Sequence, residues 1–251
     1  MVAGAQRTKA VLRLPCLGPE PMGLDRALDA VVGYARATRW LRFRSPGSPE
    51  GRWAQVPAFG WTRFDARPAS TGLDADVLLG EGLHGRLDRA GWHDVHDTLD
   101  RTAPLVDALV ARADGSPLWA QDDDELSVLG EPGTIGALLR QVGHESGPHA
   151  AHVLAALHHR HPALVPHLTR TTRRTLLPHL EEGDSGVEAV VRRDLRANDD
   201  AFAELEAAVA TAIGDARPTR LRLHDVLLWL STTLRLAHAE GEGRRFRDPG
   251  R

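Results

Sequence analysis

Cysteine is almost missing from this 251-residue sequence, in which Cys16 is the only one. A single thiol excludes an intramolecular disulfide and a thiolate metal cluster made within one chain. No stretch approaches the ~20 consecutive apolar residues of a membrane-spanning helix. No uninterrupted apolar run precedes Pro15, so a signal peptide is not expected. The sequence therefore predicts a soluble, cytoplasmic protein with no membrane partner.

Lysine is equally rare, since Lys9 is the only one and arginine supplies the remaining positive charge. The arginines are scattered, which indicates coding in a GC-rich bacterial genome rather than enrichment for one binding surface. The formal net charge is -3 at pH 7. The chain as a whole is therefore not attracted to nucleic acid or anionic lipid, and any electrostatic interaction surface must be local.

Familiar catalytic and nucleotide-binding motifs are also missing. The sequence holds no GxGxxG after a predicted strand, no P-loop, no GxSxG, no HExxH and no EF-hand loop. The common nucleotide-binding, hydrolase and metalloprotease classes are therefore not indicated, and the leading interpretation includes no cofactor.

What the sequence does contain is a long series of helical patterns. Residues 1–23 are rich in proline and glycine, and we predict a flexible lead-in there. Residues 24–238 are predicted to form a single mainly helical domain. Within it, residues 24–70 hold a helix and an irregular segment with possible short strands, and residues 72–238 form the helical core. A disordered tail is predicted for 239–251, so the fold class is mainly α, an irregular multi-helix bundle.

Several helix boundaries follow from the apolar spacing. Helical spacing from Leu24 predicts a first helix that runs to about Phe43. Pro104 is predicted to separate two short helices. The acidic run at 122–125 is predicted to begin a helix, because carboxylates suit the positive end of the helix dipole. The last helix, 219–237, is apolar over most of its circumference and is predicted to lie at the centre of the bundle.

The most coherent helix, turn, helix pattern lies in residues 134–179, which hold eight of the thirteen histidines. A turn at 143–148 separates its first two helices. His149, His152 and His159 fall near one another on the second of these helices. Two helical turns separate His159 from His152, so a surface row is expected rather than a zinc site.

The sharpest set of metal-ligand residue types lies in the segment WHDVHDTLD. His93, His96 and Asp97 stand at i, i+3 and i+4, on one helix face with Asp100. Two imidazoles and a carboxylate can supply three ligands to a divalent metal such as zinc, as in a metal-dependent enzyme. The alternative is a solvated face with ordinary i, i+4 pairing, because the apolar stripe of this helix lies opposite.

Polar residues also lie on the otherwise apolar last helix. His224, Ser231 and Arg235 share one strip of it. Polar groups on a buried helix need partners, so this strip is predicted either to line a pocket or to form hydrogen bonds within the core.

The most basic region of the chain lies between residues 134 and 180, where Glu145 is the only acid. A patch of arginines can neutralise phosphates without reading bases, although a solvated helix face has the same composition. The arginines predicted to contact phosphate are Arg160, Arg170, Arg173 and Arg174.

Two segments of the sequence, HPALVP and LHDVLLW, carry a resemblance to a known family. The matching positions are Pro162, Leu164, Val165 and Pro166 in the first segment and Leu223, Asp225, Val226, Leu228 and Trp229 in the second. On these positions the chain resembles, over roughly residues 59–236, the bacterial domain-of-unknown-function family numbered 6308. The resemblance implies a helical fold and no assigned reaction. It also implies a turn similar to that of helix-hairpin-helix modules, whose backbone amides hold a DNA phosphate.

This chain departs from the family pattern in that turn. Gly147 matches the first glycine, but His149 stands at the second, His152 replaces a threonine and Thr169 replaces an aspartate. A side chain at the second position hinders close approach of a phosphate to the backbone.

The leading hypothesis is a protein without catalytic activity that binds nucleic acid independently of sequence, through Gly147, His149 and the arginines around them. The metal-dependent enzyme is the second hypothesis. A structural or partner-binding protein without catalysis is the third, and neither a protein partner nor an oligomeric state is predicted.

Overall fold

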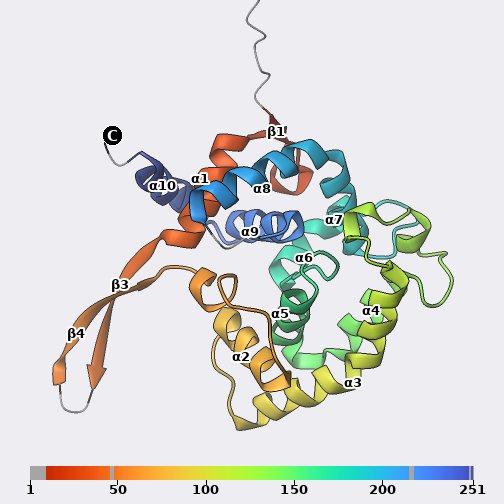
Figure 1. The fold of residues 1–251 in the computed structure, drawn as a ribbon, viewed down its shortest axis with the longest axis horizontal. Helices are drawn as coiled ribbons and strands as arrows, with labels where there is room; N and C mark the ends of the chain where they lie inside the picture. The colour runs from red at the N-terminus through yellow and green to blue at the C-terminus, as the bar shows by residue number, and fades with distance from the viewer. Residues whose placement is uncertain (1–9, 46–47, 215–217, 249, 251) are drawn as a thin grey trace, which may run out of the picture.

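The computed structural model describes residues 10–45, 48–214, 218–248 and 250. Within these residues the chain forms ten α-helices and two separate two-stranded antiparallel sheets (Figure 1). The prediction of a mainly helical fold with short N-terminal strands is confirmed. None of the helices in the described residues combines the length and apolarity needed to cross a bilayer.

The segment before the first helix is ordered. Its elements are β1 (Val11–Leu12), η1 (Pro15–Leu17) and β2 (Met22–Gly23), with β1 paired to β2. Leu12 is fully buried. The side chain of Asn198 bonds the backbone of Arg13 twice, accepting from its N–H at 2.6 Å and donating to its carbonyl at 2.9 Å. The prediction of a flexible lead-in is therefore wrong for residues 10–23, and residues 1–9 lie outside the described residues.

Helices α1 (Leu24–Arg36) and α10 (Leu236–Arg247) lie side by side although they are far apart in the sequence (Figure 1). Two glycines allow this contact. A methyl group on Gly33 would lie 1.9 Å from a backbone oxygen of α10, and one on Gly243 would lie 1.8 Å from a backbone oxygen of α1. The two helices therefore touch backbone to backbone, which only glycine permits at these positions.

Ion pairs hold the same two helices together. Arg26 contacts Glu240 at 2.7 Å, and Arg247 contacts Asp29 at 2.7 Å. The predicted disordered tail at 239–251 is therefore wrong as far as the end of α10. The charged composition of this segment suggested disorder, but Glu240 and Arg247 have ion-pair partners on α1.

The first helix is shorter than predicted, because α1 ends at Arg36 rather than near Phe43. Ala37 already has extended dihedral angles, with φ of -62° and ψ of 140°. From there β3 (Thr38–Ser45) and β4 (Ser48–Pro57) form a hairpin that projects away from the helices (Figure 1). The possible short strands predicted within residues 24–70 are therefore present as this hairpin, whose backbone groups pair with each other and whose aromatic residues favour strands.

The next two helices are α2 (Leu73–His84) and α3 (Arg89–Ala113). Helix α3 continues past Pro104 without interruption, so the predicted break there is wrong. Proline removes one backbone hydrogen bond. Burial of Leu99, Val106 and Leu109 on both sides of it favours the continuous helix.

The acidic run begins a helix, as predicted, but this helix is a single turn of 3-10 helix. The elements here are η3 (Leu118–Ala120), η4 (Asp124–Leu126) and α4 (Ile135–Glu145). Glu125 accepts a hydrogen bond from the N–H of Ile135 at 3.0 Å, so its carboxylate caps a helix farther along the chain. Asp123 pairs with Arg192 instead. A carboxylate of the acidic run therefore does stabilise a helix N-terminus, but it is the N-terminus of α4.

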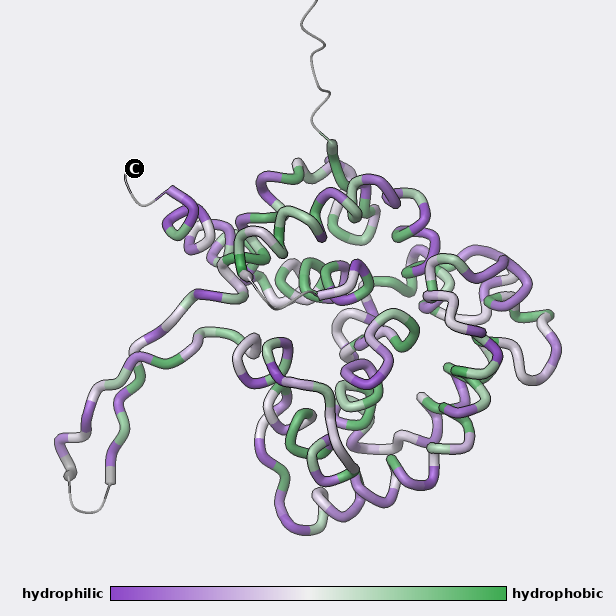
Figure 2. The backbone as a smooth tube through the Cα atoms, viewed as in Figure 1, coloured by the Kyte–Doolittle hydropathy of each residue, from purple (hydrophilic) through white to green (hydrophobic). Residues whose placement is uncertain are grey.

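The remaining elements include the central helix of the fold. They are η5 (Gly147–His149), α5 (Ala150–Arg160), α6 (Arg170–Leu176), η6 (Leu177–His179), α7 (Val187–Ala197), α8 (Asp199–Ile213) and α9 (Arg220–Thr232). Helix α9 lies in the middle of the other helices (Figure 1) and is mostly hydrophobic (Figure 2). Its predicted central burial is confirmed, with Leu221, Leu223 and Leu227 fully buried. The helix ends before the predicted 237, because Leu234 has a positive φ of 58° and turns the chain into α10.

Candidate functional site

Three buried polar residues interrupt the apolar surface of α9. Arg222, His224 and Asp225 are 5%, 0% and 2% exposed. A charged group taken out of water is costly unless it is paired and hydrogen-bonded. The partners of these three side chains therefore show which polar groups from other segments gather around α9.

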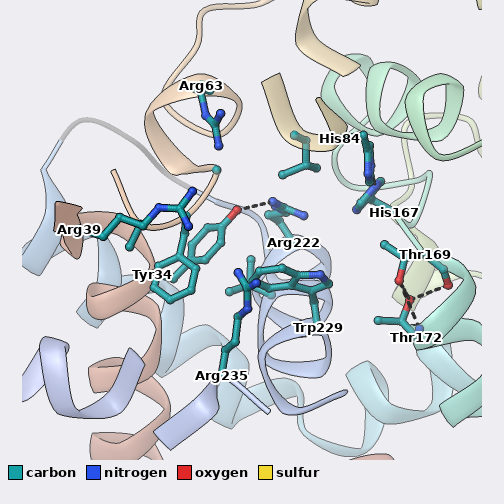
Figure 3. A pocket seen from close by; sticks show the side chains of 15 residues that line it. Tyr34, Arg39, Arg63, His84, His167, Thr169, Thr172, Arg222, Trp229 and Arg235 are labelled. Atoms are coloured by element: carbon teal, nitrogen blue, oxygen red, sulfur yellow. Dashed lines mark hydrogen bonds between the residues drawn. The ribbon is translucent and has the colours of Figure 1, made fainter. Parts of the chain in front are cut away.

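Arg222 forms a fork with Asp65, with Nε at 2.6 Å from one carboxylate oxygen and Nη2 at 3.1 Å from the other. Nη2 also contacts the hydroxyl oxygen of Tyr34 at 3.0 Å (Figure 3). Burial and the Asp65 carboxylate hold the pKa of Tyr34 far above its usual range. Burial lowers the pKa of Arg222, but Asp65 and Tyr34 outweigh that effect and raise it, so the guanidinium stays charged.

A histidine pair lies across the site from Tyr34 (Figure 3). The Nε2 atoms of His84 and His167 are 2.8 Å apart, so one ring donates to the other. The backbone N–H of His167 donates to Asp225 at 2.9 Å. Burial lowers the pKa of His84 to about 4, with His152 and Arg222 adding to the effect. Burial and Arg222 also hold the pKa of His167 well below its usual range, so both rings are neutral at pH 7.

These groups line a cavity of about 230 Å³. Its lining comes from α1, the two ends of the hairpin, η2 (Trp61–Arg63), the end of α2, the start of α6 and α9. The polar and aromatic lining residues include Tyr34, Arg39, Phe59, Arg63, His84, His167, Thr169, Thr172, Arg222, Trp229 and Arg235. The cavity is smaller than the ~300–1,000 Å³ typical of sites for drug-sized ligands, which suits a small charged group.

The charge around this cavity is positive. Arg222 is neutralised by Asp65, but Arg39, Arg63 and Arg235 have no carboxylate partner within the described residues. Figure 3 shows these three side chains coming from three separate segments. Arg235 also lies over the indole of Trp229, with its Cζ 5.3 Å from the ring centroid. Three unpaired guanidinium groups beside neutral histidines make the cavity a candidate site for an anion.

The hairpin that leads into the cavity carries exposed aromatic side chains. Trp40, Phe43 and Trp53 are 63%, 53% and 59% exposed. The strand register places Arg42 opposite Trp53 and Phe43 opposite Arg52. Each face of the hairpin therefore carries both an aromatic ring and a guanidinium group.

Positive charge dominates residues 38–57. Four arginines stand there against a single acid, Glu50. Arg42 donates to the backbone carbonyl of Glu50 at 2.6 Å. Within the part of the chain that the structure describes, Arg44 and Arg52 have no ion pair, and neither has Arg39, which belongs to both the hairpin and the cavity.

The predicted phosphate-binding turn is present as a turn. Gly147 begins η5 and has a positive φ of 58°, a conformation that favours glycine. His149 follows within η5, and its Nε2 lies 3.9 Å from a carboxylate oxygen of Asp94. An acid beside this turn weakens its attraction for a phosphate.

The arginines predicted to accompany this turn are divided. Arg160 pairs with buried Asp76, and Arg173 contacts buried Glu188 at 2.7 Å. Arg170 and Arg174 are exposed. The patch holds less free positive charge than the sequence suggested, because the two buried carboxylates needed partners.

The predicted metal ligands on α3 are not gathered into a site. His93 Nδ1 lies 2.7 Å from the carbonyl oxygen of Arg89, and His96 Nδ1 lies 3.6 Å from Asp97. Among the described residues, the group of three metal-ligating atoms within 4.8 Å of one another is formed by Cys16, Asp194 and His224. Metal binding by His93, His96 and Asp97 stays a prediction that this geometry does not support.

The predicted pocket strip is separated into two places. Arg235 lines the cavity, but His224 is buried elsewhere with Nε2 3.1 Å from Asp194, and Ser231 does not line the cavity. The prediction assumed one continuous helix. Because α9 ends at Thr232, the direction of Arg235 is set by the turn that follows.

Most residues of the cavity were missed by sequence reasoning. Arg39 lies in the stretch predicted to be the end of the first helix, and Arg63 lies in the segment predicted to be irregular. His84, His167 and Arg222 come together only through tertiary packing. A useful signal was present at 222–225, where arginine, histidine and aspartate occur within the most apolar helix of the chain.

Comparisons of the chain with family models, with curated proteins and with solved structures gave no match. The resemblance to the family numbered 6308 therefore stays a prediction, and functional inference depends on the site itself.

Proposed function

We propose that the protein binds nucleic acid independently of sequence, through the β3–β4 hairpin and the arginine-lined cavity at its base. One observation carries the proposal: exposed aromatic rings alternate with unpaired arginines along a hairpin that projects from the helical body. Aromatic rings stack on bases of any sequence, and guanidinium groups neutralise phosphates. This keeps the class of function predicted from the sequence but moves the binding surface from α5 and α6 to the hairpin.

Charge supports the location. The chain has a net charge of -3, so attraction to a polyanion must come from a local surface. The hairpin is such a surface, because its sequence holds four arginines and a single acid. On α5 and α6, by contrast, buried carboxylates already occupy Arg160 and Arg173.

The cavity extends the hairpin surface. Arg39 stands near the start of β3, and Ala58 follows the end of β4, and both line the cavity. A strand that stacks on Trp40 and Trp53 can therefore place a phosphate near Arg39, Arg63 and Arg235. The small volume suits a phosphate group better than a whole nucleotide.

Fluorescence anisotropy with a labelled single strand of about 16 nucleotides tests the proposal, because that length covers the usual site sizes for single strands. We expect binding that weakens steeply with salt. Replacing both Trp40 and Trp53 with alanine should weaken it by roughly tenfold or more, since each stacked base contributes about 1–3 kcal/mol. Strands with and without a 5′-phosphate show whether the cavity takes a terminal phosphate.

The matched control is the double variant Arg170→Ala and Arg174→Ala, which removes two exposed arginines from α6. It should bind as the unmodified protein does, whereas Arg44→Ala with Arg52→Ala should weaken binding and flatten its salt dependence. The opposite result would place nucleic acid on α6 and end the hairpin proposal. Absence of binding at low salt would end the nucleic-acid proposal altogether.

The small, arginine-lined cavity favours a second candidate function, the binding of a small phosphorylated or carboxylated metabolite without any role for the hairpin. Calorimetric titration with inorganic phosphate and with a nucleoside monophosphate tests it. Binding that is lost in Arg63→Ala with Arg235→Ala, but kept in Trp40→Ala with Trp53→Ala, supports this candidate over the first. No heat from either ligand contradicts it.

A further inference from the structure

A second buried polar cluster lies apart from the cavity and shares no lining residue with it. It joins three segments that are distant in sequence: Cys16 from η1, Asp194 from α7 and His224 from α9. Asp194 is 7% exposed and His224 is fully buried. Neither the proposed nucleic-acid surface nor the cavity uses these side chains.

The three ligand atoms of this cluster lie within 4.8 Å of one another, and two of their separations are close to those of a zinc site. The Cys16 Sγ lies 3.5 Å from Asp194 Oδ2, and His224 Nε2 lies 3.1 Å from the same oxygen. Tetrahedral zinc bonds of about 2.3 Å to sulfur and 2.0–2.1 Å to nitrogen or oxygen place neighbouring ligand atoms roughly 3.3–3.5 Å apart. The observed separations differ from these values by a few tenths of an ångström.

The other side of the His224 ring supplies an independent observation. Its Nδ1 is buried without a hydrogen-bond partner, and so is Oδ1 of Asp225. These two atoms are 3.9 Å apart. A histidine that binds metal through one ring nitrogen usually donates the other N–H to a carboxylate, which fixes the ring. Asp225 is the carboxylate beside this nitrogen, and its other oxygen is held by the backbone N–H of His167, which donates to it at 2.9 Å.

The charge of the cluster also permits a divalent cation. Metal binding requires a thiolate and an unprotonated ring nitrogen, so a cation of charge +2 would displace the thiol proton and, from the imidazolium form of His224, the proton on Nε2. Two protons leave as two positive charges enter, and the net charge of the buried cluster does not change. The cation therefore adds no net charge to the protein interior.

We propose that Cys16, Asp194 and His224 bind one zinc ion, with Asp225 orienting His224 and a water molecule as the fourth ligand. A soft thiolate with an imidazole and a carboxylate is a ligand set that suits zinc better than magnesium or calcium. The ion joins η1 to α7 and α9. It thereby fastens the N-terminal segment to the central helix.

Cobalt titration of the full chain, purified without a histidine tag and treated with a chelator, tests the site. One equivalent of Co²⁺ should produce a thiolate-to-cobalt charge-transfer band and the visible bands of a tetrahedral ion, and zinc should remove both. Cys16→Ser should abolish the charge-transfer band. Asp225→Asn should lower zinc affinity about 10–100-fold, as expected for loss of an orienting carboxylate.

The matched control is His93→Ala with His96→Ala on α3, which should leave the cobalt spectrum unchanged. Circular dichroism checks that Cys16→Ser still folds, and the similar size of serine makes this a mild change. A folded protein that gives no charge-transfer band at one equivalent of Co²⁺ overturns the proposal. A band that persists in Cys16→Ser overturns it as well.

Discussion

The β3–β4 hairpin and helix α9 use arginine in opposite ways. On the hairpin, Arg44 and Arg52 are exposed and have no ion pair within the described residues. On α9, Arg222 is 5% exposed and is held by Asp65 and Tyr34. The same side chain is therefore free to meet a ligand in one region and fixed as part of the core in the other. Whether an arginine is free or fixed therefore depends on its burial and on its partner, and not on the residue type.

The largest effect on stability is expected when the carboxylate partner of the buried arginine is removed. Asp65→Asn should lower the free energy of unfolding by about 3–5 kcal/mol, because Arg222 would remain buried without its counterion. Urea unfolding followed by circular dichroism measures the loss. As a control, Glu242→Gln removes the partner of exposed Arg245 and should cost less than ~1 kcal/mol. Equal losses in the two variants would contradict the contrast drawn between the regions.

Packing against α1 gives the second-largest effect. Gly243→Ala should destabilise the protein by about 1–3 kcal/mol, because its methyl group would overlap the backbone of α1. Gly241→Ala is a matched control in the same helix, since nothing lies within 4 Å of a methyl group there. That change should stabilise the protein by up to about 1 kcal/mol. Thermal unfolding of the two variants decides between a tight and a loose α1–α10 contact.

Acid should lower the free energy of unfolding, because His84 at the cavity is buried. The pKa of His84 falls from an ordinary 6.5 to about 4 on burial, so below pH 6.5 the unfolded chain binds more protons than the folded one. Stability from His84 is complete above pH 6.5 and is lost as the pH falls toward 4. We expect a loss on the order of 1–2 kcal/mol between pH 6.5 and 5.

Urea unfolding at several pH values measures this loss. His84→Gln should flatten the slope between pH 6.5 and 5, because glutamine does not titrate. An unchanged slope would assign the effect to other groups, including His167, whose pKa burial also lowers.

The smallest effect on stability is expected on the hairpin. Trp40→Ala should change the free energy of unfolding by less than ~0.5 kcal/mol, since the indole is mostly exposed. Trp61→Ala is the contrasting variant, because Trp61 is buried beside Tyr34, and it should cost about 3–5 kcal/mol. A large loss in Trp40→Ala would mean that the hairpin packs on the body and is not a free binding surface.

The fold could be predicted from the sequence wherever the apolar pattern of a single helix is enough to indicate how that helix is buried. The apolar circumference of 219–237 predicted a central helix, and α9 is central. Predictions went wrong where a distant partner decides the outcome. The charged segment at 239–247 suggested disorder until its partners on α1 were known, and Glu125 was assigned to its own helix although it caps α4.

The candidate site was less accessible, for the same reason. The cavity combines the start of a strand, a short 3-10 turn, the last residue of α2 and the middle of α9. Local spacing describes residues on one element and carries no signal for convergence between elements. Cys16 illustrates this, because a lone cysteine in a proline-rich lead-in gave no indication of the histidine and aspartate that lie beside it.

The contact between α1 and α10 also sets the timing of folding. Arg26 and Glu240 are 214 positions apart, and bacterial or eukaryotic ribosomes add about 5–20 residues per second. Helix α1 therefore waits roughly 10–40 s after its own synthesis before its partner helix exists. Throughout that interval the face of α1 that carries Gly33 lacks its partner helix, and the core is completed only after α10 has been synthesised.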